Sequence, residues 1–456
     1  MTKIKGAHAI LPQKQAMDAR LLPYAEKQAP RYTSYPSAPH FGGGVDGARY
    51  AQWLGALAPG AALALYIHVP YCKRICWYCG CNTSAEHAGD AEAYAATLLK
   101  EIALVSSRTR VKQVAEIHWG GGTPNVLSPH LFDAIMAALG SAFALKPPFS
   151  HAIEMDPRSL TRDHVRAYAA AGVNRASLGV QTFAPHVQEM IGRVQPFEQV
   201  ARAVDELRSA GITAISFDLM YGLPGQTQSD LMETLSRTVT IAPDRVALFG
   251  YAHVPWFKSR QRAIAVGELP GAAARFDMAA EAKAFLTAQG YEAIGMDHFA
   301  KVGDPMALAA RAGTLHRNFQ GYVASRTDAL IGLGPSAISA LPQGYAQNDP
   351  AVPGWRRAVD TGVLPIVRGH RLSEDDRLRA RIIERLMCDF KIDLADFGGR
   401  SAFAAERAML APLAADGLVE IKGNHLSIPE PMRPFCRLVA QAFDAYTATA
   451  QYSRSV

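Results

Sequence analysis

Four cysteines lie within ten residues of one another and form the densest group of reactive side chains in the sequence. Cys72, Cys76 and Cys79 have the spacing C-x3-C-x2-C, and Cys81 follows two residues later. Structural zinc usually takes two separated pairs of Cys or His ligands, and no second pair follows here. Three closely spaced thiolates suit a four-iron cube whose fourth iron stays open to a ligand. The spacing therefore favours an iron–sulfur cluster, with zinc as the alternative.

The elements that position these cysteines can be read from alternating apolar and amphipathic stretches. Short apolar runs occupy residues 62–69, 114–119, 151–155, 176–181, 214–219 and 246–253. Amphipathic stretches between them include residues 91–105, 196–210, 229–241 and 273–289. Continuous apolar runs that alternate with helices predict an α/β fold with a parallel sheet. Six such units fit either a doubly wound sheet or a partial TIM-type barrel.

The residues that end these runs favour the barrel. Polar or glycine residues follow each run: the cysteine loop, the sequence GGGTP at 120–124, Glu154 with Asp156, Gln181, Asp218 and residues 251–253. Parallel-barrel enzymes build their sites at the carboxyl ends of the strands. We therefore predict a partial (β/α)6 barrel with one cavity at that end. The alternative is that each strand simply runs into a polar loop.

Two segments flank the predicted barrel, which we place at residues 46–350. Residues 1–45 form an N-terminal extension that is rich in Pro and Tyr at 30–36 and is expected over the active site. Residues 351–456 hold helical stretches followed by a hairpin pattern at 417–428. We predict a small α-rich C-terminal domain, for which a winged-helix arrangement is one option. Such a domain either binds nucleic acid or packs against its neighbour.

Composition limits the classes of protein to which the chain can belong. Its 456 residues predict about three domains. With 49% hydrophobic and 19% charged residues, the sequence is that of a globular protein. The net charge of +6 is too dilute to indicate a nucleic-acid protein, and no apolar run reaches the ~18 residues of a membrane helix. Because the N-terminus does not resemble a secretory signal, we expect a cytoplasmic protein with reduced cysteines.

The cysteine motif, placed after the first strand of a β/α barrel, resembles that of the radical S-adenosylmethionine superfamily. Further motifs are similar to those of the oxygen-independent coproporphyrinogen III oxidases (dehydrogenases) within it. They are YIH at 66–68, CGC at 79–81, HWGGGTP at 118–124, YAH at 251–253, HRNFQGY at 316–322 and PRYTSYP at 30–36. The resemblance runs from about residue 30 to residue 340 and continues more weakly in the C-terminal domain.

This resemblance implies an activity and its cofactors. The family converts two propionates of coproporphyrinogen III to vinyl groups, which gives protoporphyrinogen IX for haem. It uses a [4Fe-4S] cluster and two molecules of S-adenosylmethionine, from which a 5′-deoxyadenosyl radical is made. The related alternative is a haem-binding chaperone without turnover. Cys81, the 30–36 stretch and the 316–322 stretch speak against that alternative.

The resemblance also implies roles for single residues. Cys72, Cys76 and Cys79 are expected to hold the cluster, and Cys81 is expected to be catalytic. The residues expected to contact S-adenosylmethionine are Tyr66, Tyr78, Gly121, Gly122, Thr123, Glu154, Gln181, Arg193, Asp218, Ala252 and Ile338. Glycines at 120–122 are expected to let backbone amides approach the ligand. Each of the polar residues could instead be an ordinary strand-end group.

Partners follow from the same comparison. Coproporphyrinogen III has four propionates, so basic side chains must line its binding site. Arg31, His316 and Arg317 are candidates, with internal ion pairs as the alternative. A low-potential electron donor such as flavodoxin or ferredoxin is expected. We expect a monomer with neither a nucleic-acid partner nor a membrane.

Overall fold

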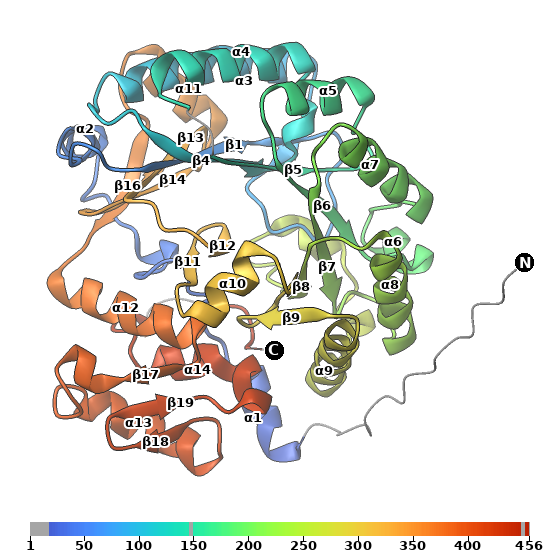
Figure 1. The fold of residues 1–456 in the computed structure, drawn as a ribbon, viewed down its shortest axis with the longest axis vertical. Helices are drawn as coiled ribbons and strands as arrows, with labels where there is room; N and C mark the ends of the chain where they lie inside the picture. The colour runs from blue at the N-terminus through green and yellow to red at the C-terminus, as the bar shows by residue number, and fades with distance from the viewer. Residues whose placement is uncertain (1–17, 146–148, 448–451, 456) are drawn as a thin grey trace, which may run out of the picture.

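The computed structural model describes residues 18–145, 149–447 and 452–455. These residues fold around one twelve-stranded sheet with the order β16-β15-β14-β13-β1-β4-β5-β6-β7-β8-β10-β9. Figure 1 shows that this sheet is strongly curved. Among the described helices, none is both long and apolar enough to cross a lipid bilayer.

The six predicted apolar runs all form neighbouring parallel strands of this sheet. They are β1 (Leu63–Val69), β4 (Val114–Gly121), β5 (Ser150–Met155), β6 (Arg175–Gln181), β7 (Ala214–Tyr221) and β8 (Arg245–Gly250). The predicted parallel α/β arrangement is therefore confirmed. The last run ends earlier than predicted, because residues 251–253 leave the sheet.

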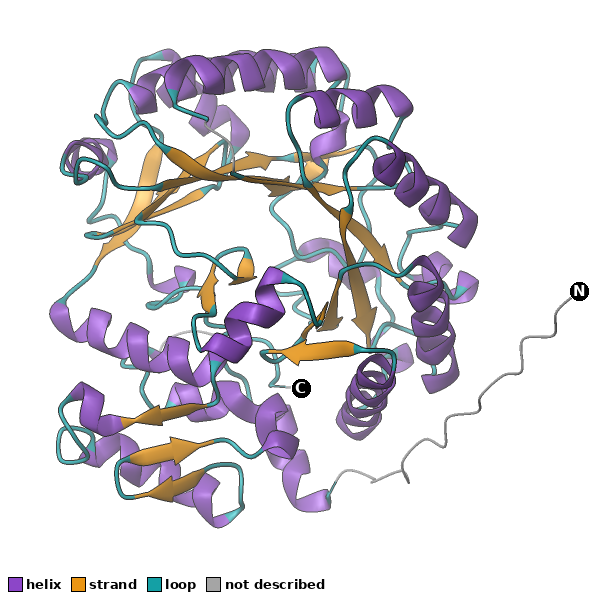
Figure 2. Ribbon diagram, in the orientation of Figure 1, coloured by secondary structure: helices purple, strands orange, loops and turns teal. Residues whose placement is uncertain are grey.

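Helices cover the convex face of the curved sheet (Figure 2). They are α3 (Asp90–Ser106), α4 (Pro129–Ala142), α5 (Arg162–Ala170), α6 (Pro185–Met190), α7 (Phe197–Ser209), α8 (Gln228–Ile241) and α9 (Ala272–Ala288). Side-chain oxygens of Ser128, Thr161 and Thr227 accept backbone N–H bonds at the starts of α4, α5 and α8. These caps satisfy donors that the first helical turn leaves unpaired.

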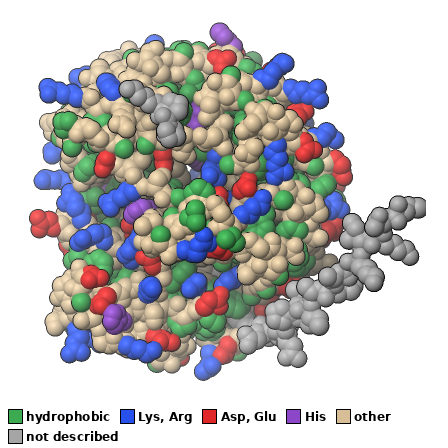
Figure 3. All heavy atoms as spheres, in the orientation of Figure 1, with side chains coloured by type: hydrophobic (Ala, Val, Ile, Leu, Met, Phe, Trp, Pro, Cys, Tyr) green, Lys and Arg blue, Asp and Glu red, His purple; other side chains and the backbone are tan. Residues whose placement is uncertain are grey.

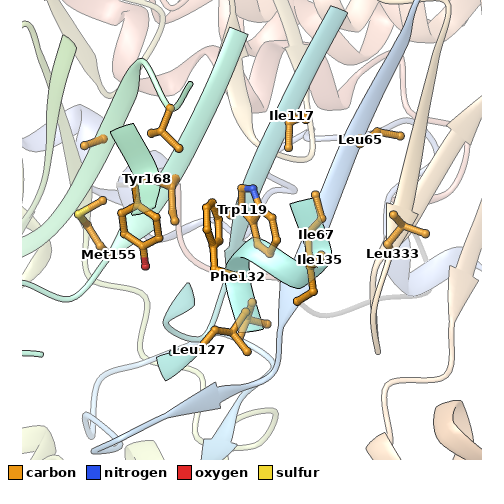
Figure 4. Close-up of a cluster of buried hydrophobic side chains, with 14 of the residues drawn as sticks. Leu65, Ile67, Ile117, Trp119, Leu127, Phe132, Ile135, Met155, Tyr168 and Leu333 are labelled. Carbon is orange, nitrogen blue, oxygen red and sulfur yellow. The ribbon is translucent and has the colours of Figure 1, made fainter. Parts of the chain in front are cut away.

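The main core lies between the parallel strands and these helices. Figure 4 shows Trp119 of β4 between strand residues such as Ile67 and the ring of Phe132 from α4. The Trp119 and Phe132 ring centroids are 4.9 Å apart, and the Trp119 indole N–H donates to His151 Nε2 at 3.1 Å. This packing fixes the strands whose carboxyl ends carry the predicted site residues.

Both edges of the sheet carry strands that the sequence did not predict. One edge has β10 (His298–Lys301) and β9 (Tyr291–Ile294), both antiparallel. The other has β13 (Ala329–Leu333), parallel to β1, followed by antiparallel β14 (Ile338–Leu341), β15 (Gly344–Asn348) and β16 (Ile366–Arg371). Shorter connecting elements are α2 (Gly47–Gly55), α10 (Pro305–Ala312), β11 (His316–Asn318), β12 (Gly321–Val323) and α11 (Val352–Asp360).

The C-terminal region combines helices with a small antiparallel sheet. It contains α12 (Glu374–Cys388), β17 (Lys391–Asp393), α13 (Ala404–Ala415), β18 (Glu420–Lys422), β19 (His425–Ser427) and α14 (Cys436–Gln441). The predicted hairpin corresponds to β18 and β19, and β17 adds a third strand beside β19. The winged-helix option stays a prediction.

The N-terminal extension packs against this C-terminal region. Tyr24 in α1 (Leu22–Glu26), Tyr32 and Tyr35 are buried in the same cluster as Leu386 and Phe443. The Tyr32 hydroxyl donates to Asp444 Oδ2 at 3.0 Å, and Tyr35 Oη accepts the N–H of Ala445 at 3.0 Å. The extension and the C-terminal region therefore share one hydrophobic core.

Candidate active site

The cysteine loop leaves the carboxyl end of β1 and is held against the glycine-rich end of β4. The N–H of Gly122 donates to the carbonyl of Val69 at 2.7 Å, and that of Thr123 to the carbonyl of Tyr71 at 2.8 Å. Two short parallel strands, β2 (Tyr71–Cys72) and β3 (Ser84–Ala85), close the loop at its base. The loop is therefore fixed at both ends to the edge where the parallel strands end.

Each of the three predicted ligand sulfurs receives hydrogen bonds. The hydroxyl of Thr123 donates to Cys72 Sγ at 3.3 Å. The guanidinium of Arg193 donates to Cys76 Sγ at 3.4 Å, and that of Arg158 to the same sulfur at 3.6 Å. The backbone N–H of Cys81 donates to Cys79 Sγ at 3.4 Å. Since donors of this kind stabilise thiolates, the loop fits an anionic iron–sulfur cluster.

Cys79 and Cys81 differ in their readiness to ionise. Hydrogen bonding from the Cys81 side chain and backbone lowers the pKa of Cys79 to about 6. The same pairing raises the pKa of Cys81 well above its ordinary value. In the described part of the chain, no three His, Cys, Asp or Glu side chains converge closely enough to hold a single metal ion. Of the two thiols, Cys79 is the more readily ionised.

Glycines 120–122 give room to neighbouring side chains and backbone. A Cβ at Gly120 would lie 2.8 Å from Glu154 Oε1, and one at Gly121 would lie 2.6 Å from the His68 ring. A Cβ at Gly122 would lie 2.4 Å from the carbonyl oxygen of Tyr71. Gly121 also has φ +106°, a conformation that other residues rarely adopt. The absent side chains thus leave room for Glu154, His68 and the cysteine loop, and the predicted approach of this backbone to a ligand stays a prediction.

Polar residues at the ends of β5, β6 and β7 meet beside this loop. His118 Nε2 lies 3.0 Å from Glu154 Oε1, and Ser177 Oγ donates to Asp218 Oδ2 at 3.3 Å. Burial, together with the negative charge of Glu154, raises the pKa of Asp218 to about 7. Gln181 has φ +67° at the end of β6, where the pairing with β7 shifts register. These side chains come from separate strands yet face one another, as the barrel prediction requires.

Asp156 organises the two arginines that reach Cys76. It pairs with Arg158 at 2.6 Å and with Arg193 at 3.3 Å. Arg193 also donates to the carbonyl of Gly179 at 2.6 Å and is 7% exposed. Arg158 was not predicted, and its only signal in the sequence is its position two residues after Asp156.

Tyr66, Tyr78 and Ala252 lie around the same centre. The Tyr66 ring stacks on His118 with centroids 5.9 Å apart, and its hydroxyl is 3.1 Å from His68 Nδ1. The side-chain amide of Gln261 donates to the carbonyl of Tyr78 at 2.7 Å and to that of Ala252 at 3.1 Å. Gln261, which the sequence did not single out, therefore ties the cysteine loop to the segment after β8.

Ile338 and Cys81 occupy the margins of the site. Ile338 is half-buried and begins β14, two strands from β1 in the sheet. Cys81 is exposed, and its carbonyl accepts a hydrogen bond from Lys258 Nζ at 3.3 Å. The specific roles assigned to these and the other site residues stay predictions.

His316 and Arg317, the other candidates for substrate binding, make internal contacts. His316 Nδ1 lies 3.2 Å from Glu384 Oε1. Arg317 donates to the backbone carbonyls of Arg31 and Tyr32 at 2.9 to 3.2 Å. His316 and Arg31, which lies 3.6 Å from Asp297, therefore contact internal carboxylates as the alternative expects. Arg317 binds backbone carbonyls instead and fixes the backbone that carries Arg31.

Comparison with known proteins first gives the class of protein. Residues 66–238 match the family model of the radical SAM superfamily, and residues 372–434 match that of the HemN C-terminal domain. The three-cysteine loop after β1 and the partial barrel are thus those of a radical S-adenosylmethionine protein.

Whole-chain comparisons then give the family. An oxygen-independent coproporphyrinogen III oxidase of Bradyrhizobium diazoefficiens is 48% identical, over 93% of this chain and 96% of its own length. Its namesake in Escherichia coli K12 is 37% identical over 94% and 95% of the two chains. The solved structure of the E. coli coproporphyrinogen III oxidase HemN, described as a radical SAM enzyme, superposes with a TM-score of 0.87 at 36% identity. It covers 92% of this chain and 100% of that one. The chain belongs to the family of oxygen-independent coproporphyrinogen III oxidases.

Family membership confirms the predicted resemblance, the partial-barrel fold and the enzyme class. It also confirms the prediction of a [4Fe-4S] cluster and S-adenosylmethionine. The number of S-adenosylmethionine molecules stays a prediction.

Proposed function

We propose that this protein catalyses the oxidative decarboxylation of two propionates of coproporphyrinogen III and so makes protoporphyrinogen IX for haem. Each propionate loses carbon dioxide, one hydrogen atom that ends in 5′-deoxyadenosine, and one electron that passes to an electron acceptor, and so becomes a vinyl group. The observation that carries this proposal is the cysteine loop, whose three sulfurs receive hydrogen bonds at the edge where the polar strand ends meet. Relatives that align over nearly the whole chain bear the name of this activity.

Cys72, Cys76 and Cys79 would hold the cluster in this proposal. When bound, the cluster and S-adenosylmethionine supply a one-electron reductant and a group that abstracts hydrogen atoms. Asp156 aims the guanidinium groups of Arg158 and Arg193 at Cys76, so positive charge lies beside that thiolate. Their charge would favour binding of an anionic cluster.

The carboxylates of Glu154 and Asp218 would orient S-adenosylmethionine. Carboxylates accept hydrogen bonds from ribose hydroxyls and from an ammonium group, both of which this cofactor carries. Gln181 and Arg193 would add further polar contacts with this cofactor, as would the backbone of Gly121, Gly122 and Thr123.

An external protein must provide the electron for the cluster. We propose a low-potential donor of the flavodoxin or ferredoxin class, and a monomeric, cytoplasmic enzyme. Lys73 and Arg74 lie exposed on the cysteine loop, and Lys258 contacts Cys81, which suits an acidic partner. On the face drawn in Figure 3, basic and acidic side chains are interspersed.

Anaerobic turnover tests this function. Reconstituted and reduced protein is supplied with coproporphyrinogen III and S-adenosylmethionine, and vinyl products, methionine and 5′-deoxyadenosine are counted. We expect vinyl formation in step with cofactor cleavage. Stoichiometric haem binding without any vinyl product would contradict the proposal and favour a haem chaperone.

A further inference from the structure

A large cavity opens beside the candidate active site. Its volume is about 1520 Å³, and its walls come from the carboxyl ends of β7 and β8, from α9, from the N-terminal extension and from the C-terminal region. Tyr221, Gly250 and Ala252 line its barrel end. Gln261 links Ala252 to the cysteine loop through Tyr78, so this end of the cavity adjoins the candidate active site.

The cavity wall carries more positive than negative side chains. Its basic residues are Arg31, Arg275, Lys283, Arg433, Arg437 and Arg454, and its acidic residues are Asp18, Asp297 and Glu430. Two of the carboxylates are already engaged, because Glu430 pairs with Lys283 and Asp18 pairs with Arg20 outside the cavity wall. The wall therefore keeps several cationic groups without a carboxylate partner among the described residues.

Arg275 on α9 is the clearest of these groups. Its Nε is buried and has no hydrogen-bond partner among the described residues, and no described carboxylate lies within ion-pair distance of the guanidinium. Burial and the nearby charges of Arg454 and Arg31 lower its pKa. An uncompensated buried charge of this kind is unfavourable unless an anion binds beside it.

Arg31 and Arg437 surround Arg275 from the other two regions. Arg31 lies 3.6 Å from Asp297 and donates to the carbonyl of Gly250 at 3.3 Å, and its side chain is 35% exposed. Arg437 is 4% exposed and donates to backbone carbonyls, including that of Ala29 at 2.9 Å. Burial and the charge of Arg31 lower the pKa of Arg437 to about 10. Three guanidinium groups thus gather at one side of the cavity with Asp297 as their only close carboxylate among the described residues.

We propose that this cavity is the substrate site and that Arg275 and Arg31 anchor propionate carboxylates of the tetrapyrrole. Arg437 supplies positive potential from behind them. This inference rests on the proposed function, because it takes the four propionates of coproporphyrinogen III as the anionic ligand. Both arginines lie close to Gly250 at the end of β8, where they would hold carboxylates of the tetrapyrrole beside the candidate active site.

The shape and composition of the cavity support this assignment. Its volume of about 1520 Å³ exceeds the about 300 to 1,000 Å³ of most small-molecule sites. A cavity of this size suits a ligand as large as a tetrapyrrole together with a cofactor at the barrel end. Apolar side chains such as Leu248, Phe276 and Met296 line the wall between the charged groups. An apolar macrocycle with charged margins fits that alternation.

Binding of a stable porphyrin separates this inference from catalysis. The probe is coproporphyrin III, the oxidised tetracarboxylate, and its tetramethyl ester is the uncharged control; both are titrated by fluorescence into cluster-loaded protein. The variants are Arg275→Gln, Arg275→Lys and Arg31→Gln. The matched control is Arg237→Gln, which removes an arginine paired with Glu233 on α8, away from the cavity.

We expect Arg275→Gln and Arg31→Gln each to weaken coproporphyrin III binding by about 10- to 100-fold, the range for losing a charged hydrogen bond. Arg275→Lys should recover part of the affinity. Arg237→Gln should bind coproporphyrin III as wild type does, and the weak binding of the ester should be the same in all variants. In turnover, KM for coproporphyrinogen III should rise while the S-adenosylmethionine affinity stays constant. If Arg275→Gln does not fold, the half-exposed Arg31 decides the test.

Failure of this inference differs from failure of the proposed function. Equal binding of the acid and its ester, or wild-type Kd and KM in both glutamine variants of an enzyme that turns over, would overturn the anchoring role. Tight, arginine-dependent binding of the tetracarboxylate without vinyl formation would uphold the site and refute the decarboxylation.

Discussion

Asp218 offers a sharp test of the candidate cofactor site through pH. Its pKa is raised to about 7 by burial and by the negative charge of Glu154. A ligand that donates hydrogen bonds or carries an ammonium group binds the ionised carboxylate better than the protonated one. Affinity for S-adenosylmethionine should therefore rise as pH rises through 7, since the ionised fraction of Asp218 rises.

The size of this effect follows from the pKa. With a pKa of about 7, the ionised fraction of Asp218 is about 3% at pH 5.5 and about half at pH 7, which is about a 15-fold increase. The α-amino group of the ligand titrates at about 7.7 to 8.0, so measurements stay at or below pH 7. Asp218→Asn retains the shape and the bond from Ser177 but has no proton to lose.

Anaerobic calorimetry of S-adenosylmethionine binding to cluster-loaded protein checks this prediction. Wild type should gain about 15-fold in affinity from pH 5.5 to 7, and Asp218→Asn should show a much smaller change and weaker binding at pH 7. Asp205→Asn, on the exposed face of α7, is the matched control and should behave as wild type. The same pH slope in Asp218→Asn and wild type would refute the reasoning.

Three further predictions address the cluster, the fold and the loop. Cys76→Ala should lose bound iron and the cluster absorption, whereas Cys388→Ala, a buried cysteine of the C-terminal region, should retain both. Burial raises the pKa of Glu101 to about 7. Glu101 thus stays protonated to higher pH in the folded state than in the unfolded state, and the free energy of unfolding should fall by about 2 kcal/mol between pH 5.5 and 8. Urea unfolding should show that Glu101→Gln removes this contribution. Gln261→Ala removes three hydrogen bonds. The two that tie the cysteine loop to the segment after β8 contribute about 1 kcal/mol each, so amide exchange in the loop should accelerate by up to about 30-fold; unchanged exchange would show that Gln261 does not restrain the loop.

The parallel strands could be predicted because almost none of their positions is exposed: one face of each strand is buried and the other is at least half-buried. Such strands appear in the sequence as continuous apolar runs, and β1 is buried at six of its seven positions. The edge strands could not be found in this way. β9, for example, has four residues, of which two are only half-buried, and its place is set by pairing with β10 rather than by its own pattern.

The same distinction applies to the site. Residues at strand ends, such as Glu154 and Asp218, could be predicted because parallel topology brings all strand ends to one edge. Gln261 lies in a short 3-10 helix, Ser259–Ala263, and acquires its role from the carbonyls of Ala252, which follows β8, and of Tyr78 in the cysteine loop. Arg275 is one of two basic residues in the Ala-rich helix α9, and only the cavity distinguishes it from a solvated charge.

The three regions of the chain are coupled by the way they share the cavity. Arg275 comes from the barrel, Arg31 from the N-terminal extension and Arg437 from the C-terminal region. Arg437 donates to the carbonyl of Ala29, two residues before Arg31, and Arg317 donates to the carbonyl of Arg31 itself. Because the extension and the C-terminal region share one core, displacing either would remove two of the three guanidinium groups from the cavity together. The carboxylates of the bound substrate would in turn link all three regions. The tetracarboxylate should therefore stabilise the contact of the C-terminal region with the barrel.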